Sequence, residues 1–136
     1  MSEDCVFCRI IQRQAPAYVI TEDDHIISFL SKENHPLIVP KRHIPDIYSL
    51  DEATGAHIMS AAIEVARAVK AGLACEGIYL TQANEPAAGQ DVFHVHLHIY
   101  PRWRAVDFRT QQTAQHVSDA DKQETLRKIT ACLRSS

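Results

Sequence analysis

Three histidines occupy alternate positions late in the chain, in the run His94-Val95-His96-Leu97-His98-Ile99-Tyr100. Strict alternation is typical of a β-strand, whose successive side chains point to opposite faces. The run predicts a strand over about 92–100, with the histidines in a row roughly 6.5–7 Å apart at Cα and the apolar residues in the core. Neutral imidazoles act as nucleophiles, carry protons and bind metals. The row alone therefore leaves covalent catalysis and metal chemistry open.

A second pattern lies near the N-terminus, where Cys5 and Cys8 form a C-x-x-C pair. A redox pair of this kind usually follows a strand in a βαβ unit, whereas this pair stands almost at the start of the sequence. The position favours zinc, which needs two further ligands for a closed tetrahedral site, and His43 and His94 are the candidates. Two ordinary cysteines are the alternative interpretation.

Composition limits the classes of function. The chain has 136 residues, 46% of them hydrophobic and 23% charged, which fits one soluble domain. A net charge of −3 predicts no general attraction to nucleic acid or to a membrane. No apolar run approaches the about 20 residues of a membrane span, and the first residues do not resemble a signal peptide. We therefore expect a cytoplasmic protein whose four cysteines are thiols or metal ligands.

The elements that must position these residues form an α+β pattern. Short strands are predicted at 18–20, 25–30, 37–39 and 78–81. A long helix is expected after a capping box of Ser49 and Glu52, with its end marked by Gly72. Its predicted apolar stripe comprises Met59, Ile63, Ala66, Val69 and Leu73. With a second helix expected over 119–133, the pattern predicts one domain, 1–136, with a mainly antiparallel sheet.

Together these motifs resemble those of the histidine triad (HIT) superfamily, in particular its bacterial, zinc-bearing members among the Hint- and Fhit-like hydrolases. Residues 94–101 match the signature H-x-H-x-H-x-x, and residues 35–43 resemble the family segment that precedes the long helix, without its glycine before His35. Gly89-Gln90 resembles the Gly-Gln pair before the triad, and the cysteine pair resembles the family's zinc knuckle. The resemblance covers about residues 5–102, which leaves 103–136 as a C-terminal extension.

The resemblance implies a nucleotide hydrolase or transferase that cleaves nucleoside phosphoramidates or dinucleoside polyphosphates at the α-phosphate. His96 would be the nucleophile and form a covalent nucleotidyl-histidine, His98 would bind the phosphate oxygens, and His35 would support the nucleophile. Predicted contacts to the substrate, besides His98, are Gln90, Asp91 and Asn84. The resemblance further implies a homodimer that binds a small-molecule nucleotide.

The resemblance also assigns the metal ligands. Cys5, Cys8, His43 and the side chain of His94 would hold a structural zinc that takes no part in activating water. The backbone of His94 would orient the nucleophile.

This sequence departs from the family pattern in two places. Asp91 stands where many members have a Ser or Thr that donates a hydrogen bond to the leaving group; a carboxylate repels phosphate, whereas a protonated Asp91 donates. The loop over 30–34 is shorter than in many members, so Glu33 or Asn34 would have to hold the ribose.

Two other functions remain open: a zinc-dependent hydrolase that uses the histidine row as metal ligands, and a nucleotide-binding module without turnover.

Overall fold

A computed structural model describes residues 4–105 and 117–133, so parts of the predicted C-terminal extension, 106–116 and 134–136, lie outside the described residues. Within them, five strands pair antiparallel in the order β1-β2-β3-β5-β4. Their bounds are β1 (Val19–Glu22), β2 (Ile26–Leu30), β3 (Pro36–Pro40), β4 (Gly77–Thr81) and β5 (Leu97–Arg102). The predicted α+β class with an antiparallel sheet is confirmed.

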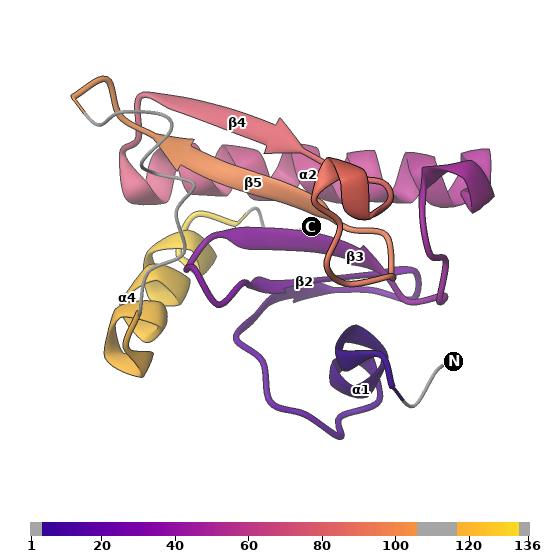
Figure 1. The fold of residues 1–136 in the computed structure, drawn as a ribbon. Helices are drawn as coiled ribbons and strands as arrows, with labels where there is room; N and C mark the ends of the chain where they lie inside the picture. The colour runs from indigo at the N-terminus through magenta and orange to yellow at the C-terminus, as the bar shows by residue number, and fades with distance from the viewer. Residues whose placement is uncertain (1–3, 106–116, 134–136) are drawn as a thin grey trace.

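The helices surround this sheet. They are α1 (Val6–Ile11), α2 (Glu52–Leu73) and α4 (Asp119–Thr130), with short 3₁₀ turns η1 (Ile47–Ser49) and η2 (Pro86–Ala88). In Figure 1, α2 runs behind β4 and β5. Helix α1 lies apart from α2, below β2, and α4 lies at the lower left, where it contacts α2 and β1. None of the helices in the described ranges has the length and apolar character that crossing a membrane requires.

Helix α2 begins and packs differently from the prediction. Asp51, and not Ser49, caps the helix, because its Oδ2 accepts a hydrogen bond from the backbone N–H of Thr54 at 3.0 Å. The predicted stripe is wrong at Met59 and Ile63, which are 49% and 46% exposed, whereas Val69 is buried and Ala66 and Leu73 pack partly buried against the core. The side chains that face the sheet are Ile58, Ala62, Val65, Ala68 and Val69. Apolar residues follow both phases of the helix, so periodicity alone did not select the buried one.

Two clusters of buried side chains lie on the two faces of the sheet. The larger one joins α2 to Ile26, Ile38 and Ile99 of three neighbouring strands. The smaller one joins α1, through Phe7 and Cys8, to strand residues Ile27, Phe29, Leu37 and Val39. Strand β2 therefore has apolar residues buried on both faces, and α1 is held by the face opposite to α2.

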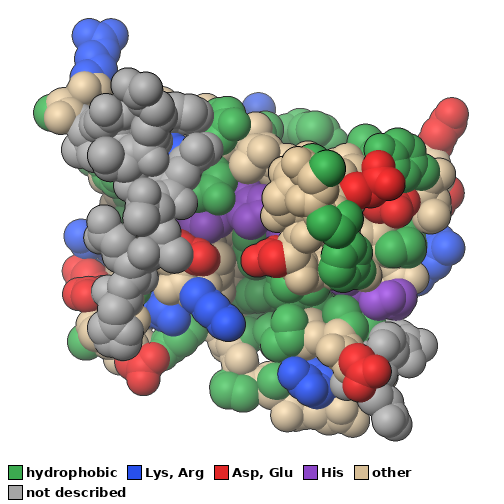
Figure 2. Space-filling view, viewed as in Figure 1, with side chains coloured by type: hydrophobic (Ala, Val, Ile, Leu, Met, Phe, Trp, Pro, Cys, Tyr) green, Lys and Arg blue, Asp and Glu red, His purple; other side chains and the backbone are tan. Residues whose placement is uncertain are grey.

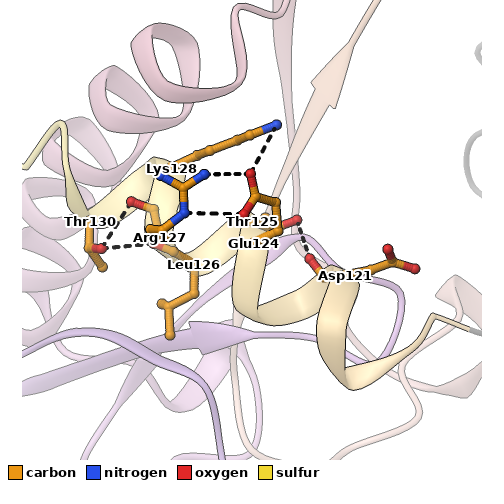
Figure 3. A network of polar contacts seen from close by, with 7 residues as sticks. All are labelled: Asp121, Glu124, Thr125, Leu126, Arg127, Lys128 and Thr130. Carbon is orange, nitrogen blue, oxygen red and sulfur yellow. Dashed lines mark hydrogen bonds and ion pairs between the residues drawn. The ribbon is translucent and has the colours of Figure 1, made fainter.

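Helix α4 packs against α2 at an unusually close point. Gly72 lies inside α2 and does not end it; the C-cap is Ala74, in the left-handed region at φ 51°. A Cβ on Gly72 would overlap the carbonyl oxygen of Lys128, so only glycine fits here. Polar contacts within α4, drawn in Figure 3, join Arg127 and Lys128 to Glu124.

Two side-chain hydrogen bonds tie α4 to the sheet side of the molecule. Tyr18 Oη donates to Asp119 Oδ1 at 2.7 Å, and Asn34 Nδ2 donates to Thr125 Oγ1 at 2.8 Å. Asn34 has φ 73°, a conformation that Asn tolerates better than most residues. The short loop before β3 is thereby anchored to α4.

Candidate active site and metal centre

The histidine run is a strand only in its second half. Strand β5 begins at Leu97, and residues 92–96 have no regular structure, so the predicted strand over 92–100 is wrong for its first part. The backbone N–H of Val95 donates to Ile44 O at 2.7 Å, outside any strand ladder. Val95 and Ile99 are buried as predicted, at 2% and 0% exposed, whereas Leu97 is only partly buried against the larger cluster. His94 and His96 are therefore placed by local contacts and not by a shared sheet face.

The ring of His96 is oriented by the backbone two residues earlier. His96 Nδ1 lies 2.8 Å from the carbonyl oxygen of His94. A carbonyl only accepts, so Nδ1 must carry the proton, and Nε2 keeps its lone pair. Phe7 packs edge-on against the same ring, with centroids 5.0 Å apart and planes at 89°. His96 is thus held with an available nucleophilic nitrogen.

A second chain of hydrogen bonds joins Ser31, His35 and His98. Ser31 Oγ accepts from the backbone N–H of His35 and lies 3.0 Å from His35 Nδ1. His35 Nε2 lies 2.9 Å from His98 Nδ1, and Tyr100 Oη lies 3.4 Å from the same nitrogen. When the Ser31 hydroxyl donates to His35 Nδ1, His35 Nε2 donates to His98 Nδ1. With Nδ1 of His98 accepting, its Nε2 carries the proton.

Burial keeps these imidazoles neutral near pH 7. Desolvation lowers the pKa of His35 to about 3, assisted by the nearby His98 and Arg102. Desolvation and the neighbouring His96 lower the pKa of His98 to about 4, although Asp91 opposes the shift. The pKa of His96 is lowered by desolvation, against the His94 carbonyl and Asp91. Neutral rings supply one lone pair and one N–H donor side by side, as acyl or phosphoryl transfer requires.

These three histidines line one cavity of about 550 Å³. The apolar part of its wall comes from α1 and the strands, including Val6, Phe7, Phe29 and Leu37. The charged side chains that line it are Lys32, Glu33, Asp91 and Lys122. Figure 2 shows histidine side chains at the bottom of a hollow on this face, with acidic side chains on both sides. A cavity of this size and mixed lining suits a small molecule such as a nucleotide.

Two of the predicted substrate contacts have other partners in the structure. Gln90 is 5% exposed; its Oε1 accepts from the N–H of Glu85 and its Nε2 donates to the carbonyls of Pro45 and Val92. Asn84 exchanges hydrogen bonds with Gln82 and accepts one from the N–H of Ile47. Neither lines the cavity, whereas Asp91 does. Both amides hold together the loops that carry Asp91.

The four predicted metal ligands come together on the other side of His94. Their ligand atoms, from Cys5, Cys8, His43 and His94, all lie within 4.8 Å of one another. His94 Nε2 lies 2.7 Å from Pro40 O and donates to it, which leaves Nδ1 to face the cluster. Desolvation lowers the pKa of His94 to about 4, so its ring is neutral as a ligand must be.

The spacing of this cluster fits a tetrahedral zinc ion. Zinc bonds of 2.0–2.3 Å to nitrogen and sulfur give tetrahedron edges of about 3.3–3.8 Å. The Sγ atoms of Cys5 and Cys8 each lie 3.5 Å from His94 Nδ1. His43 Nδ1 lies 3.2 Å from both Cys8 Sγ and His94 Nδ1. Two thiols and two imidazoles complete four-fold coordination, which is the ligand set of a structural zinc site.

Sequence reasoning missed several residues that support the site. Ser31 lies in the loop before β3 and contacts His35, which in turn contacts His98. Phe7 was only a spacer in the cysteine pair, yet it packs on His96. Lys122 comes from α4, about 25 residues after the triad. Phe7 and Lys122 are far in sequence from the histidines of the cavity, whereas Ser31 is only four residues before His35 but is of a type common in loops. Nothing in residue type or spacing therefore singles these positions out.

Known proteins resemble this chain in sequence and fold. The family model described as HIT domain matches residues 12–105. Protein hit from Bacillus subtilis (strain 168) is 32% identical over 136 residues, covering 97% of this chain and 93% of that protein.

Two crystal structures match at the level of the fold. A Hit-like protein from Bartonella henselae has a TM-score of 0.87 and 28% identity, covering 98% of this chain and 99% of the other. A Zn-bound histidine triad family protein from Mycobacterium smegmatis has a TM-score of 0.81 and 31% identity, covering 95% and 92%. This chain therefore belongs to the HIT family.

Proposed function

We propose that the protein is a nucleotide hydrolase or transferase that cleaves nucleoside phosphoramidates or dinucleoside polyphosphates at the α-phosphate through a nucleotidyl-histidine. The observation that carries this proposal is the contact between His96 Nδ1 and the His94 carbonyl, because it frees Nε2 for attack. We assign the proton of the neighbouring His98 to Nε2, with Nδ1 accepting from His35, so that its ring supplies the donor that a phosphoryl oxygen needs. Both rings line the same cavity.

The proposed reaction has two displacements. In the first, the lone pair of His96 Nε2 forms a bond to phosphorus, and the bond from phosphorus to the leaving group breaks. The leaving group departs with that electron pair and takes a proton from water. In the second, a water oxygen bonds to phosphorus and loses a proton to solvent, the N–P bond breaks with its electron pair returning to His96 Nε2, and a nucleoside monophosphate is released. His98 stabilises the charge on the phosphoryl oxygens in both steps, and His35 and Ser31 hold its ring.

We assign zinc a structural role on the cluster of Cys5, Cys8, His43 and His94. Four protein ligands leave no open position for substrate, which a catalytic zinc requires. Within the described residues this is the sole group of ligands that could hold a metal, and it includes neither His96 nor His98. The alternative of a zinc-dependent hydrolase built on the histidine row is therefore less well supported.

The decisive experiment measures hydrolysis of adenosine phosphoramidate, adenylyl sulfate and a dinucleoside polyphosphate by the wild type and by His96→Ala. We expect His96→Ala to lose turnover of every substrate that the wild type hydrolyses. Acid quenching of the wild type with labelled substrate should trap one nucleotide on the protein. His57→Ala is the matched control, since His57 stacks on His25 and does not line the cavity.

The same experiment tests the binding-module alternative. Full activity of His96→Ala on these substrates contradicts the covalent mechanism. Tight binding of nucleoside monophosphate by the wild type, with neither turnover nor trapped nucleotide, establishes a binding module instead.

We also propose that two copies associate. Met59 and Ile63 on the outer face of α2, and Leu80 on the edge strand β4, are 41–49% exposed. Burying such side chains favours self-association. Sedimentation velocity should give a dimer for the wild type and a smaller species for Ile63→Glu; a monomeric wild type contradicts the proposal.

A further inference from the structure

We propose that Asp91 makes the site selective for nucleoside phosphoramidates whose amine carries a further positive charge, and selects against sulfates, polyphosphates and other anionic leaving groups. This inference rests on the proposed function, because it concerns the group that leaves phosphorus after attack by His96. It adds the chemical class of that group.

Asp91 lines the cavity together with His96 and His98. Its carboxylate acts electrostatically on both rings, so it lies near the point at which phosphorus would be attacked. Across residues 4–105 and 117–133 no hydrogen bond or ion pair engages this carboxylate. Gln90, immediately before it, is bonded to three backbone groups and holds this part of the loop in place.

The cavity has three other charged side chains, and none of them acts on His96 or His98; they are Lys32, Glu33 and Lys122. Glu33 acts on Tyr100 and on neither His96 nor His98. Lys122 extends over the ring of Tyr18, with Nζ 5.9 Å from the ring centroid. Lys32 also lines the cavity but acts on neither histidine. Asp91 is therefore the carboxylate that lines the cavity beside the neutral imidazoles of His96 and His98. Arg102 acts on His35 and lies over the ring of Tyr100, with Cζ 4.7 Å from the centroid, but it does not line the cavity.

A negative charge at this point discriminates between substrates by simple electrostatics. The phosphoryl group is itself anionic, so every substrate meets the same repulsion there. A cation on the leaving amine offsets this repulsion, whereas a sulfate, a phosphate or a carboxylate adds to it. For unit charges separated by several ångströms near a protein surface, we expect about tenfold in kcat/KM per unit charge, which corresponds to about 1.4 kcal/mol.

Three adenosine phosphoramidates with the same P–N bond test this inference. Their amines are ethylenediamine, which ends in an ammonium, propylamine, which is neutral, and β-alanine, which ends in a carboxylate. Wild-type kcat/KM should fall in that order, by about tenfold at each step. In Asp91→Asn the steps should shrink to about threefold or less, and Asp91→Ser should reproduce this change. Glu33→Gln is the matched control, a second carboxylate of the same cavity, and should keep the wild-type steps.

The possible outcomes separate this inference from the proposed function. Equal kcat/KM for the three compounds in the wild type overturns the selectivity but leaves the hydrolase intact. Unchanged steps in Asp91→Asn, or steps lost equally in Glu33→Gln, overturn the role of Asp91. Failure of the wild type to hydrolyse the neutral propylamine compound, or its hydrolysis by His96→Ala, overturns the proposed function itself. If the Asp91 variants do not fold, the order of the three compounds in the wild type still decides the selectivity.

Discussion

His94 contacts two centres at once: its ring nitrogen Nδ1 faces the sulfur atoms of Cys5 and Cys8, and its backbone carbonyl accepts the Nδ1–H of His96. The four candidate metal ligands and the proposed nucleophile are therefore adjacent, but no atom belongs to both centres. The tautomer of His96 is set by a peptide group, without a carboxylate partner. This relationship determines which substitutions should affect metal binding and which should affect chemistry.

Substitution of a cysteine should separate the two centres. Cys8→Ser should lose the zinc and lower the melting temperature, because metal binding contributes directly to folding. Cys132→Ser, at an exposed free cysteine outside the cluster, should retain one zinc per chain. Metal analysis and thermal unfolding of the purified proteins measure both effects. Equal zinc content in the two variants would contradict the assigned ligands.

Replacing His98, the proposed hydrogen-bond donor to the phosphoryl oxygens, should slow the chemical step. His98→Ala should lower kcat by about 10²–10³-fold, the usual cost of losing one transition-state donor, with a smaller change in KM. His98→Gln restores an N–H donor on a side chain of similar length and should recover part of that loss. Steady-state kinetics with a phosphoramidate provides the comparison. A rise in KM at unchanged kcat in His98→Ala would instead identify His98 as a simple binding group.

The stability of the fold should decrease in acid because of His35. Its pKa is about 3 in the folded chain and 6.5 for an ordinary imidazole, so below pH 6.5 the unfolded chain binds a proton that the folded chain does not. The contribution of neutral His35 to the free energy of unfolding is therefore fully present above pH 6.5 and is lost as the pH falls toward about 3. Between pH 6.5 and 5 this effect costs about 2 kcal/mol.

The variant His35→Gln isolates that contribution. It cannot titrate in this range, so its free energy of unfolding should decrease by about 2 kcal/mol less than that of the wild type between pH 6.5 and 5. Urea unfolding at both pH values measures the difference. The zinc ligands titrate alike in both proteins and cancel in the comparison. Parallel loss of stability in the two proteins would show that His35 is not kept neutral by the fold.

Substitution by alanine should have opposite effects on stability at two glycines of α2. Gly72→Ala should destabilise the protein by about 1–3 kcal/mol, because the methyl group would overlap the backbone of α4 at Lys128. Gly55→Ala meets only Leu50, at 3.8 Å, and should stabilise the helix by about 0.5–1 kcal/mol. Urea unfolding of both variants measures these changes. A stable Gly72→Ala protein would mean that α4 shifts away at little cost.

Much of the fold was predictable because it depends on local patterns. Strands bounded by proline, such as β3, and the polar start of α4 at Ser118 follow from residue preferences that neighbours do not override. The phase of α2 was not predictable in this way. Its buried face includes Ala62 and Ala68, small side chains that let the helix approach the sheet and that contribute little to a hydrophobic pattern.

The residues that form the site were easier to predict than their geometry. Spacing and resemblance identified the four residues that converge on the metal cluster. They also placed His94 and His96 on a strand, whereas the contact of Val95 with Ile44 draws this segment away from the sheet. The amides of Gln90 and Asn84 were expected to face substrate, but unpaired backbone groups in the neighbouring loops bind them. Such competition between partners cannot be read from residue type.

One wall of the cavity belongs to the smaller core, on the α1 side of the sheet. Val6, Phe7 and Ile10 form part of that wall, and the short helix that carries them is capped by Cys5 and includes Cys8. A helix of six residues has little stability of its own. Depletion of zinc should therefore loosen α1 locally while the core under α2 stays folded. On the proposed assignment of zinc and substrate, the shape of the pocket depends on an ion that does not contact the substrate.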